Sequence, residues 1–146
     1  MFRGNHPTRI DEKGRLKVPA DFKRVLDESY GQRFYITSRD GKIAEIYPIE
    51  EWEKFENKFA QLPSMHPGVK KFLNTTSYWG QEVEIDGQGR LLMPGLLREA
   101  AALKGDVAVV GSLNHLEVRV LDDYKKWIEQ NPITPEDEQA LAQLGL

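Results

Sequence analysis

The sequence repeats one ten-residue pattern at a fixed distance. Residues 10–19 read Ile-Asp-Glu-Lys-Gly-Arg-Leu-Lys-Val-Pro and residues 85–94 read Ile-Asp-Gly-Gln-Gly-Arg-Leu-Leu-Met-Pro, so six of ten positions are identical at an offset of 75. In a chain of 146 residues, each half therefore carries one copy. An internal repeat constrains the fold strongly, because it requires two similar structural units. A shared core accounts for the repeated Ile, Leu and Pro, whereas the repeated Asp-x-x-Gly-Arg needs a role in turn geometry or in binding.

The composition is that of a folded protein without disulfides. Hydrophobic residues make up 40% of the chain, with six Phe, five Tyr and three Trp, which is enough for a real core. No cysteine is present, so disulfides, thiolate metal sites and cysteine nucleophiles are excluded. The sequence shows no signal peptide and no apolar run long enough to span a membrane. We expect a protein of a reducing compartment, the cytoplasm.

Charge is distributed unevenly along the chain, although the net charge is only −3. Residues 1–24 carry seven basic residues against three acidic ones, while residues 121–146 carry two against six. Ordinary surface scatter is one explanation, and a positive face for a polyanion with the acidic end turned elsewhere is the other. The seven basic residues are Arg3, Arg9, Lys13, Arg15, Lys17, Lys23 and Arg24.

The two halves also match downstream of the motif, where Glu45–Trp52 corresponds to Glu117–Tyr124. Each half therefore predicts the same series of strand, turn, strand, short helix, strand, strand and helix. The predicted units are residues 1–62 and 77–131, joined by a linker with a short helix at 63–76 and followed by a tail helix at 132–146.

Local periodicity places these elements. Arg15–Val18 alternates polar and apolar residues, which predicts a strand with one buried face, and Pro19 ends it. The Arg39–Gly41 turn joins two further strands. Thr134 and Pro135 are typical of the first residues of a helix. The remaining strands are expected near 34–36, 43–47, 81–85, 90–93, 107–111 and 116–120, and helices near 22–30, 52–62, 69–75, 95–103 and 122–130.

The Asp-x-x-Gly-Arg motif suits a turn that presents a guanidinium. Asp11 can accept hydrogen bonds from the backbone amides of the turn, and Gly14 can supply a positive φ. Arg15 then leaves the turn on the face opposite Leu16, where Asp11 can hold its guanidinium in place. A planar fork of donors on a rigid turn fits phosphate groups and guanine edges. The alternative is a hairpin with a surface ion pair, which the second copy of the motif makes less favourable.

The two copies are not equivalent in charge. In the second copy Gln88 replaces Lys13, Leu92 replaces Lys17, and two glutamates lie just upstream. We therefore interpret the first copy as the main anion-binding turn. The second copy is either an auxiliary contact or committed in part to packing against another subunit.

Signals for metals or catalysis are weak. The three histidines, His6, His66 and His115, lie in unrelated segments without metal-ligand spacing. Gly87-Gln88-Gly89 resembles part of a phosphate loop but lacks the Lys-Ser/Thr that should follow. We predict no metal site, no cofactor and no enzymatic activity.

Two units of this design, with Asp-Glu-Lys-Gly-Arg in one and Asp-Gly-Gln-Gly-Arg in the other, resemble the MraZ family. The opening Met-Phe-Arg-Gly and the length extend the resemblance to essentially the whole chain. It implies the fold of the AbrB-like swapped-hairpin DNA-binding domains: an α+β fold with a mainly β core, in which two tandem strand–turn–strand–helix units form a pseudo-two-fold barrel with peripheral short helices. It also implies a homo-oligomeric ring on the nucleoid that regulates the transcription of the division and cell-wall gene cluster.

The resemblance further implies that both motifs contribute to a DNA-binding face. The expected partners are double-stranded DNA and further copies of the chain, with no membrane and no small-molecule substrate. Because one basic turn offers few phosphate contacts, we expect an oligomer that binds direct repeats. An antitoxin-like interaction module, whose acidic tail masks a partner, is the alternative. The predicted DNA-binding residues are Arg3, Asp11, Lys13, Arg15, Lys17, Asp86, Gln88 and Arg90.

Overall fold

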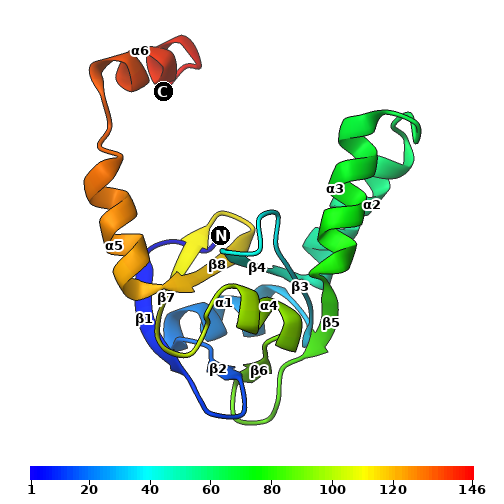
Figure 1. The fold of residues 1–146 in the computed structure, drawn as a ribbon, viewed down its shortest axis with the longest axis vertical. Coiled ribbons are helices and arrows are strands. Elements are labelled where there is room, and N and C mark those ends of the chain that lie inside the picture. Colours follow the sequence, from blue (N-terminus) through cyan, green and yellow to red (C-terminus); the bar gives the residue numbers. More distant parts are fainter.

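The two halves of the chain form the same series of elements in the computed structural model, which describes all 146 residues (Figure 1). This series confirms the predicted order of strand, turn, strand, helix, strand, strand and helix. The first half contains β1 (Asn5–Ile10), β2 (Arg15–Lys17), α1 (Ala20–Ser29), β3 (Arg33–Thr37), β4 (Ala44–Pro48) and α2 (Ile49–Ala60). After α3 (Pro67–Tyr78), the second half contains β5 (Gln81–Glu84), β6 (Arg90–Leu92), α4 (Gly95–Ala100), β7 (Gly105–Ser112), β8 (His115–Val120) and α5 (Leu121–Gln130), and α6 (Pro135–Gln143) follows.

One predicted helix is shorter than expected. The helix predicted over 95–103 ends at Ala100, because Ala102 takes a positive φ of 52° that a right-handed helix cannot continue. The N–H of Leu103 then donates to the carbonyl of Arg98 at 2.9 Å. This turn buries Leu103 completely and directs the chain into β7.

The two halves exchange strands within a single antiparallel sheet. Its order is β5-β3-β4-β8-β7-β1-β2-β6, so β1 of the first half pairs with β7 of the second, and β5 of the second half pairs with β3 of the first. The edge strands β5 and β6 are joined by their own turn, where the N–H of Asp86 donates to the carbonyl of Arg90 at 3.0 Å. Once these edges meet, exchanging the two halves leaves the strand order unchanged. The sheet is thus a nearly closed, pseudo-two-fold barrel of swapped hairpins, as predicted.

The repeated apolar residues line the barrel interior. Leu16 and Leu91 are register partners across β2 and β6, and both are fully buried. Ile10 and Ile85, which precede the two turns, are buried to 3% and 9% exposure. The repeated Ile and Leu of the motif therefore belong to one cluster of 20 buried hydrophobic residues that both halves share.

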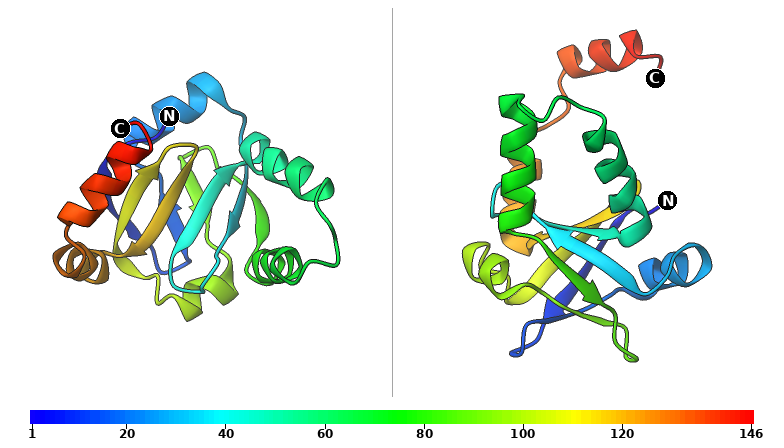
Figure 2. Two further views of the ribbon diagram at one scale, coloured as in Figure 1. Left: turned by 90° about the horizontal axis from the view of Figure 1, so that it is seen from above. Right: turned by 90° about the vertical axis from the view of Figure 1, so that its right-hand side faces the viewer.

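Four helices, α2, α3, α5 and α6, form two arms at the end of the barrel away from the β1–β2 and β5–β6 turns (Figures 1 and 2). One arm is the α2–α3 hairpin, in which Phe59 stacks on Phe72 with ring centroids 4.6 Å apart. Trp52 anchors this arm to the sheet by stacking on Tyr35 at 4.6 Å. The other arm consists of α5 and α6. No helix has the length and apolar composition that a membrane span requires.

Because Leu16 and Leu91 are equivalent buried side chains, Leu16→Ala and Leu91→Ala should each lower the free energy of unfolding by about 2–5 kcal/mol. Leu92→Ala is the matched control, since Leu92 is 55% exposed, and it should cost less than about 1 kcal/mol. Urea unfolding followed by circular dichroism measures all three. A large loss for only one of the buried leucines would contradict a core that both halves share equally.

Candidate nucleic-acid interface

The two motif turns lie side by side at one end of the barrel (Figure 2). Their proximity follows from the pairing of β2 with β6, which sets Arg15 opposite Leu92 and Lys17 opposite Arg90. Leu16 and Leu91 point into the core between them, so these four side chains share the outer face. The structure thus brings the basic residues of both copies onto one surface.

The first turn holds Arg15 through a single carboxylate. Oδ1 of Asp11 accepts the backbone N–H groups of Lys13 and Arg15 at 3.0 and 2.9 Å. Oδ2 accepts Nε–H of the Arg15 side chain at 2.8 Å. Gly14 closes the turn with a φ of 84°, and its N–H donates to the carbonyl of Asp11 at 2.9 Å. Asp11 therefore fixes both the backbone of the turn and the direction of the guanidinium.

The second turn repeats this geometry bond for bond. Oδ1 of Asp86 accepts the backbone N–H groups of Gln88 and Arg90, both at 2.9 Å, and Oδ2 accepts Nε–H of Arg90 at 3.0 Å. Gly89 has a φ of 75°. The Arg15 and Arg90 side chains are 30% and 25% exposed. The two copies thus differ in their neighbouring charges and hardly at all in how the arginine is held.

Hydrogen bonding keeps both aspartates ionised. The pKa of Asp11 is lowered from its usual value, chiefly by the backbone N–H of Arg15 and also by the Arg15 side chain. The pKa of Asp86 is lowered in the same way, chiefly by the backbone N–H of Arg90. Because the pKa of each aspartate is lower in the folded protein, these contacts stabilise the fold fully at pH values above the ordinary carboxyl pKa. This stabilisation is lost as pH falls through the folded-state pKa. Near neutral pH Asp11 and Asp86 are therefore ionised, and each holds its arginine side chain by a charged hydrogen bond.

Each turn is also bound by the other half of the chain. The N–H of Val18 donates to the carbonyl of Gly89 at 3.0 Å, and the N–H of Met93 donates to the carbonyl of Gly14 at 2.9 Å. Lys17 donates its Nζ to the carbonyl of Gln88. These reciprocal contacts fix the two turns relative to each other, which makes them one surface.

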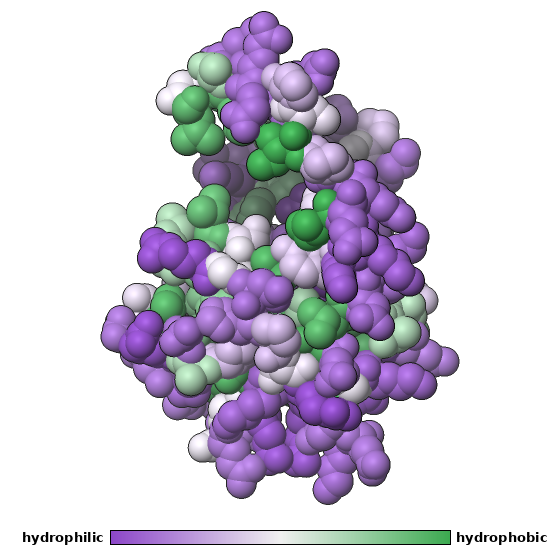
Figure 3. Space-filling view, turned by 90° about the vertical axis from the view of Figure 1, so that its left-hand side faces the viewer, coloured by the Kyte–Doolittle hydropathy of each residue, from purple (hydrophilic) through white to green (hydrophobic).

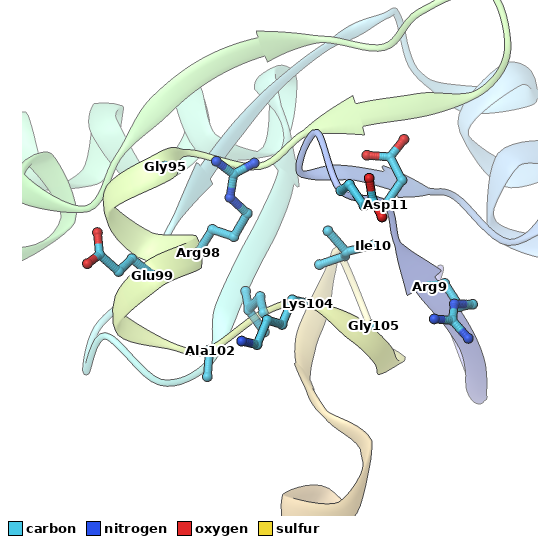
Figure 4. Close-up of a pocket in the computed structure, with 11 residues that line it drawn as sticks. Arg9, Ile10, Asp11, Gly95, Arg98, Glu99, Ala102, Lys104 and Gly105 are labelled. Carbon is cyan, nitrogen blue, oxygen red and sulfur yellow. The ribbon is translucent and has the colours of Figure 1, made fainter.

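Arg98 is a functional candidate that the sequence reasoning missed. It extends from α4 toward the first turn and donates Nη1–H to the carbonyl of Lys13 at 3.0 Å (Figure 4). Its counterpart at the offset of 75 is Lys23 on α1, which lies near the second turn at Gly89 and pairs with Asp27 at 2.6 Å. A comparison of the two halves at the offset of 75 could have identified Lys23 and Arg98 as equivalent basic residues from the sequence alone.

A groove of about 760 Å³ adjoins Arg98 between the first turn and the segment that leads into β7 (Figure 4). Three cations and three carboxylates line it, so its charge is balanced and we assign no ligand to it. The charged lining residues are Arg9, Arg98, Lys104, Asp11, Glu12 and Glu99.

Arg3 does not join the turn surface. It precedes β1, whose first residue, Asn5, pairs with Val110, whereas the turn follows the last residue, Ile10. At about 3.3 Å per residue, the length of β1 separates Arg3 from Asp11 by roughly 25 Å. The other predicted residues, Asp11, Lys13, Arg15, Lys17, Asp86, Gln88 and Arg90, all belong to the two turns and the strands that leave them.

These features define an internally duplicated swapped-hairpin barrel of the AbrB-like class, with one aspartate-braced arginine turn in each half. The family model described as "MraZ protein, putative antitoxin-like" matches residues 1–75 and 80–144. The chain belongs to the MraZ family.

Similar proteins named transcriptional regulator MraZ occur in several bacteria. The one from Acidobacterium capsulatum is 62% identical over 146 residues, which cover all of both chains. The one from Koribacter versatilis is 59% identical over 147 aligned positions, again covering both chains fully. The one from Syntrophobacter fumaroxidans is 41% identical over 117 residues, which are 80% of this chain and 77% of that protein.

The contact between Arg98 and the first turn predicts unequal effects of two equivalent glycine substitutions. Alanine at Gly14 or Gly89 is strained by the positive φ, at a cost of about 1–2 kcal/mol. At Gly14 the new Cβ would also lie 1.1 Å from Nη1 of Arg98, whereas at Gly89 the nearest atom is 3.4 Å away. Gly14→Ala must therefore displace Arg98 and lose a further ~0.5–1.5 kcal/mol with its hydrogen bond.

A double-mutant cycle measured by urea unfolding tests this prediction. In an Arg98→Ala background the extra cost of Gly14→Ala should vanish, while the cost of Gly89→Ala should stay the same. Equal costs for the two glycine variants in both backgrounds would show that Arg98 does not hold the first turn.

Proposed function

We propose that this protein is a DNA-binding transcriptional regulator whose contact surface consists of the two motif turns. The observation that carries the proposal is the identical bracing of Arg15 and Arg90 on one face of the barrel. In both residues only Nε engages the aspartate, so the terminal nitrogens of each guanidinium remain available to a ligand. A planar donor fork held in a fixed direction fits phosphate oxygens and guanine edges. The names of the relatives support the same function.

The arrangement of charge supports this orientation on DNA. Lys13, Arg15, Lys17 and Arg90 gather at the turn end. The acidic first turns of α5 and α6 belong to an arm at the opposite end of the molecule (Figure 1). A nucleic-acid backbone that meets the turn end is therefore kept away from the acidic arm, which it would repel.

The finer proposal is sequence-specific binding by a homo-oligomer on direct repeats upstream of the division and cell-wall gene cluster. One pair of turns offers about three or four phosphate contacts, and each contact contributes a salt slope of about −0.9. Such a surface binds DNA weakly, and its affinity falls steeply as the salt concentration rises. Linking several copies makes later contacts intramolecular and raises avidity by ~10²–10⁴. Head-to-tail assembly closes into a ring that presents its turns in the same direction, which suits direct repeats rather than a palindrome.

Exposed apolar side chains on the α5–α6 arm support the oligomer. Trp127 and Ile128 on α5 are about half exposed, and Ile133 in the following segment is 71% exposed. Figure 3 shows apolar patches on this side of the molecule, whereas the turn end is almost uniformly hydrophilic. Several exposed apolar side chains on one arm make this arm the candidate site for another protein chain.

An antitoxin-like interaction module is the second candidate. The helix α6 begins with a capping box in which Thr134 accepts from the N–H of Asp137 at 3.1 Å, and its first turn carries three acids. It extends away from the barrel (Figure 2). A stable acidic helix at the end of an arm is suited to mask a basic partner protein, in line with the antitoxin-like description of the family.

Arg15→Ala should weaken binding to operator DNA by about 1–3 kcal/mol per subunit engaged, because it removes the braced guanidinium. Arg90→Ala should lose less, because its own turn carries Gln88 where the first turn carries Lys13. Lys17, which lies opposite Arg90, is unchanged in both variants. Arg3→Ala is the matched control, since it removes the same charge at the far end of β1 and should leave affinity unchanged. Fluorescence anisotropy with selected operator DNA, repeated at several salt concentrations, measures each variant. Unchanged affinity in a folded Arg15→Ala protein would remove the first turn from the DNA surface.

Light scattering of the full chain at micromolar concentration should give a mass several times the 16.7 kDa of one subunit. The reason is that Trp127, Ile128 and Ile133 leave apolar surface on the α5–α6 arm that a second copy would bury. Trp127→Glu should lower the mass and the avidity together, because it places a charge in the exposed apolar surface of α5. A monodisperse monomer that binds one site tightly would rule out the ring.

A further inference from the structure

The pairing of β4 with β8 places two glutamates face to face. Glu45 and Glu117 are register partners across these strands, and they occupy equivalent positions in the two halves of the sequence. The pseudo-two-fold axis of the barrel therefore passes between them. Like charges directly opposite each other on neighbouring strands repel and destabilise a sheet. Glu45 is only 7% exposed, so solvent screens this repulsion poorly and positive charge near the pair is stabilising. Arg39 supplies part of that charge, with its Nε 3.3 Å from Oε2 of Glu45.

His115 extends into the space between these carboxylates. It lies two residues before Glu117 on β8, so both side chains project from the same outer face of the sheet. Its Nε2 is 3.2 Å from Oε2 of Glu117 and 3.6 Å from Oε1 of Glu45. The side chains of His115 and Glu117 are 12% and 29% exposed. One imidazole nitrogen and two carboxylate oxygens thus converge within 4.8 Å of one another.

We propose that Glu45, His115 and Glu117 form a binding site for a divalent transition-metal ion, with zinc as the probe. Ligand atoms about 2.0–2.2 Å from a tetrahedral zinc ion lie about 3.3–3.6 Å from each other, which matches the two distances from Nε2. One imidazole with two carboxylates favours zinc, manganese or iron over magnesium and calcium, which prefer oxygen ligands alone. This site is independent of the proposed DNA surface, because it lies at the end of the barrel that carries the helical arms.

Residues around the three ligands hold them in place. Nδ1 of His115 lies 2.9 Å from Oδ1 of Asn114, and when Nδ1–H donates there, Nε2 offers its lone pair to the ion. The imidazole ring stacks on Tyr47 with centroids 4.4 Å apart. The hydroxyl of Tyr47 donates to Oε1 of Glu45 at 3.0 Å, and Nε of Arg39 lies 3.3 Å from Oε2. Second contacts of this kind are typical of metal ligands and fix their direction before an ion arrives.

The site is accessible from solvent. A cavity of about 280 Å³ opens onto it and is lined by all three ligands together with Arg39, Asp40 and Ile43. An ion can enter through this cavity, and water there can complete its coordination. Because β4 belongs to the first half and β8 to the second, a bound ion would join the two halves at their axis.

Zinc titration of the chelator-treated, tag-free full chain tests the proposal. Isothermal titration calorimetry should show one zinc ion per chain, and zinc should raise the melting temperature. His115→Gln and Glu117→Gln should each weaken binding at least tenfold and abolish the thermal shift. His66→Asn is the matched control, because it removes a histidine elsewhere and Asn preserves the side-chain acceptor that His66 offers to the N–H of Gly68 at the start of α3.

A second measurement uses the unaltered protein, so it does not depend on the folding of any variant. One equivalent of zinc should shift the imidazole NMR signals of His115 and leave those of His6 and His66 in place. Absence of zinc binding, equal affinity in His115→Gln, or shifts confined to the other two histidines would each overturn the proposal. DNA binding by the same preparation is measured separately. If the protein bound zinc but not DNA, the proposed function of the turns would be wrong and the metal site would stand.

Discussion

The strand exchange between the two halves is the constraint on which the rest of the structure depends. Pairing of β1 with β7 and of β5 with β3 means that neither half has a complete sheet without the other. An isolated half would expose open strand edges, which bind other chains readily. The same exchange brings the two turns to one end of the barrel, sets Leu16 against Leu91 in the core, and sets Glu45 against Glu117 near the helical arms. The core, the proposed DNA surface and the proposed metal site therefore all follow from one pairing pattern.

The two halves share the hydrogen bonds of the motif and differ in the side chains that surround it. The bracing of Arg15 by Asp11 and of Arg90 by Asp86 is the same in both copies. The side chains around these pairs differ, because Lys17 binds the carbonyl of Gln88 while its counterpart Leu92 is an exposed apolar residue. The backbone of the turn is thus determined by the aspartate and glycine, whereas the surrounding charge is free to vary. On such a surface the arginines keep the same geometry, while substitutions of the neighbouring residues change the affinity for the proposed DNA ligand.

Much of the fold could be predicted from the sequence because its signals are local. Alternation around Leu16, the Asp–Gly turn and the offset of 75 indicated the elements, the turns and the braced arginines. Contacts between distant segments could not be predicted in this way. The approach of Arg98 to the carbonyl of Lys13, and of His115 to Glu45, depends on which strands become neighbours in the barrel. Arg3 was grouped with the turns from its charge, but the extended strand β1 between Arg3 and Asp11 carries it to the other end of the barrel.

The invariance of the strand order under exchange of the halves has a consequence for how the barrel assembles. A single half of this design, paired with an identical copy, would produce the same ring of strands as a homodimer. The stability of such a dimer would depend on protein concentration, because the unfolded halves separate. Here residues 61–80, which include α3, covalently join the halves and make their association a first-order process. The barrel of this chain is in effect a tethered dimer, whose folding is insensitive to dilution and whose two halves can evolve separately.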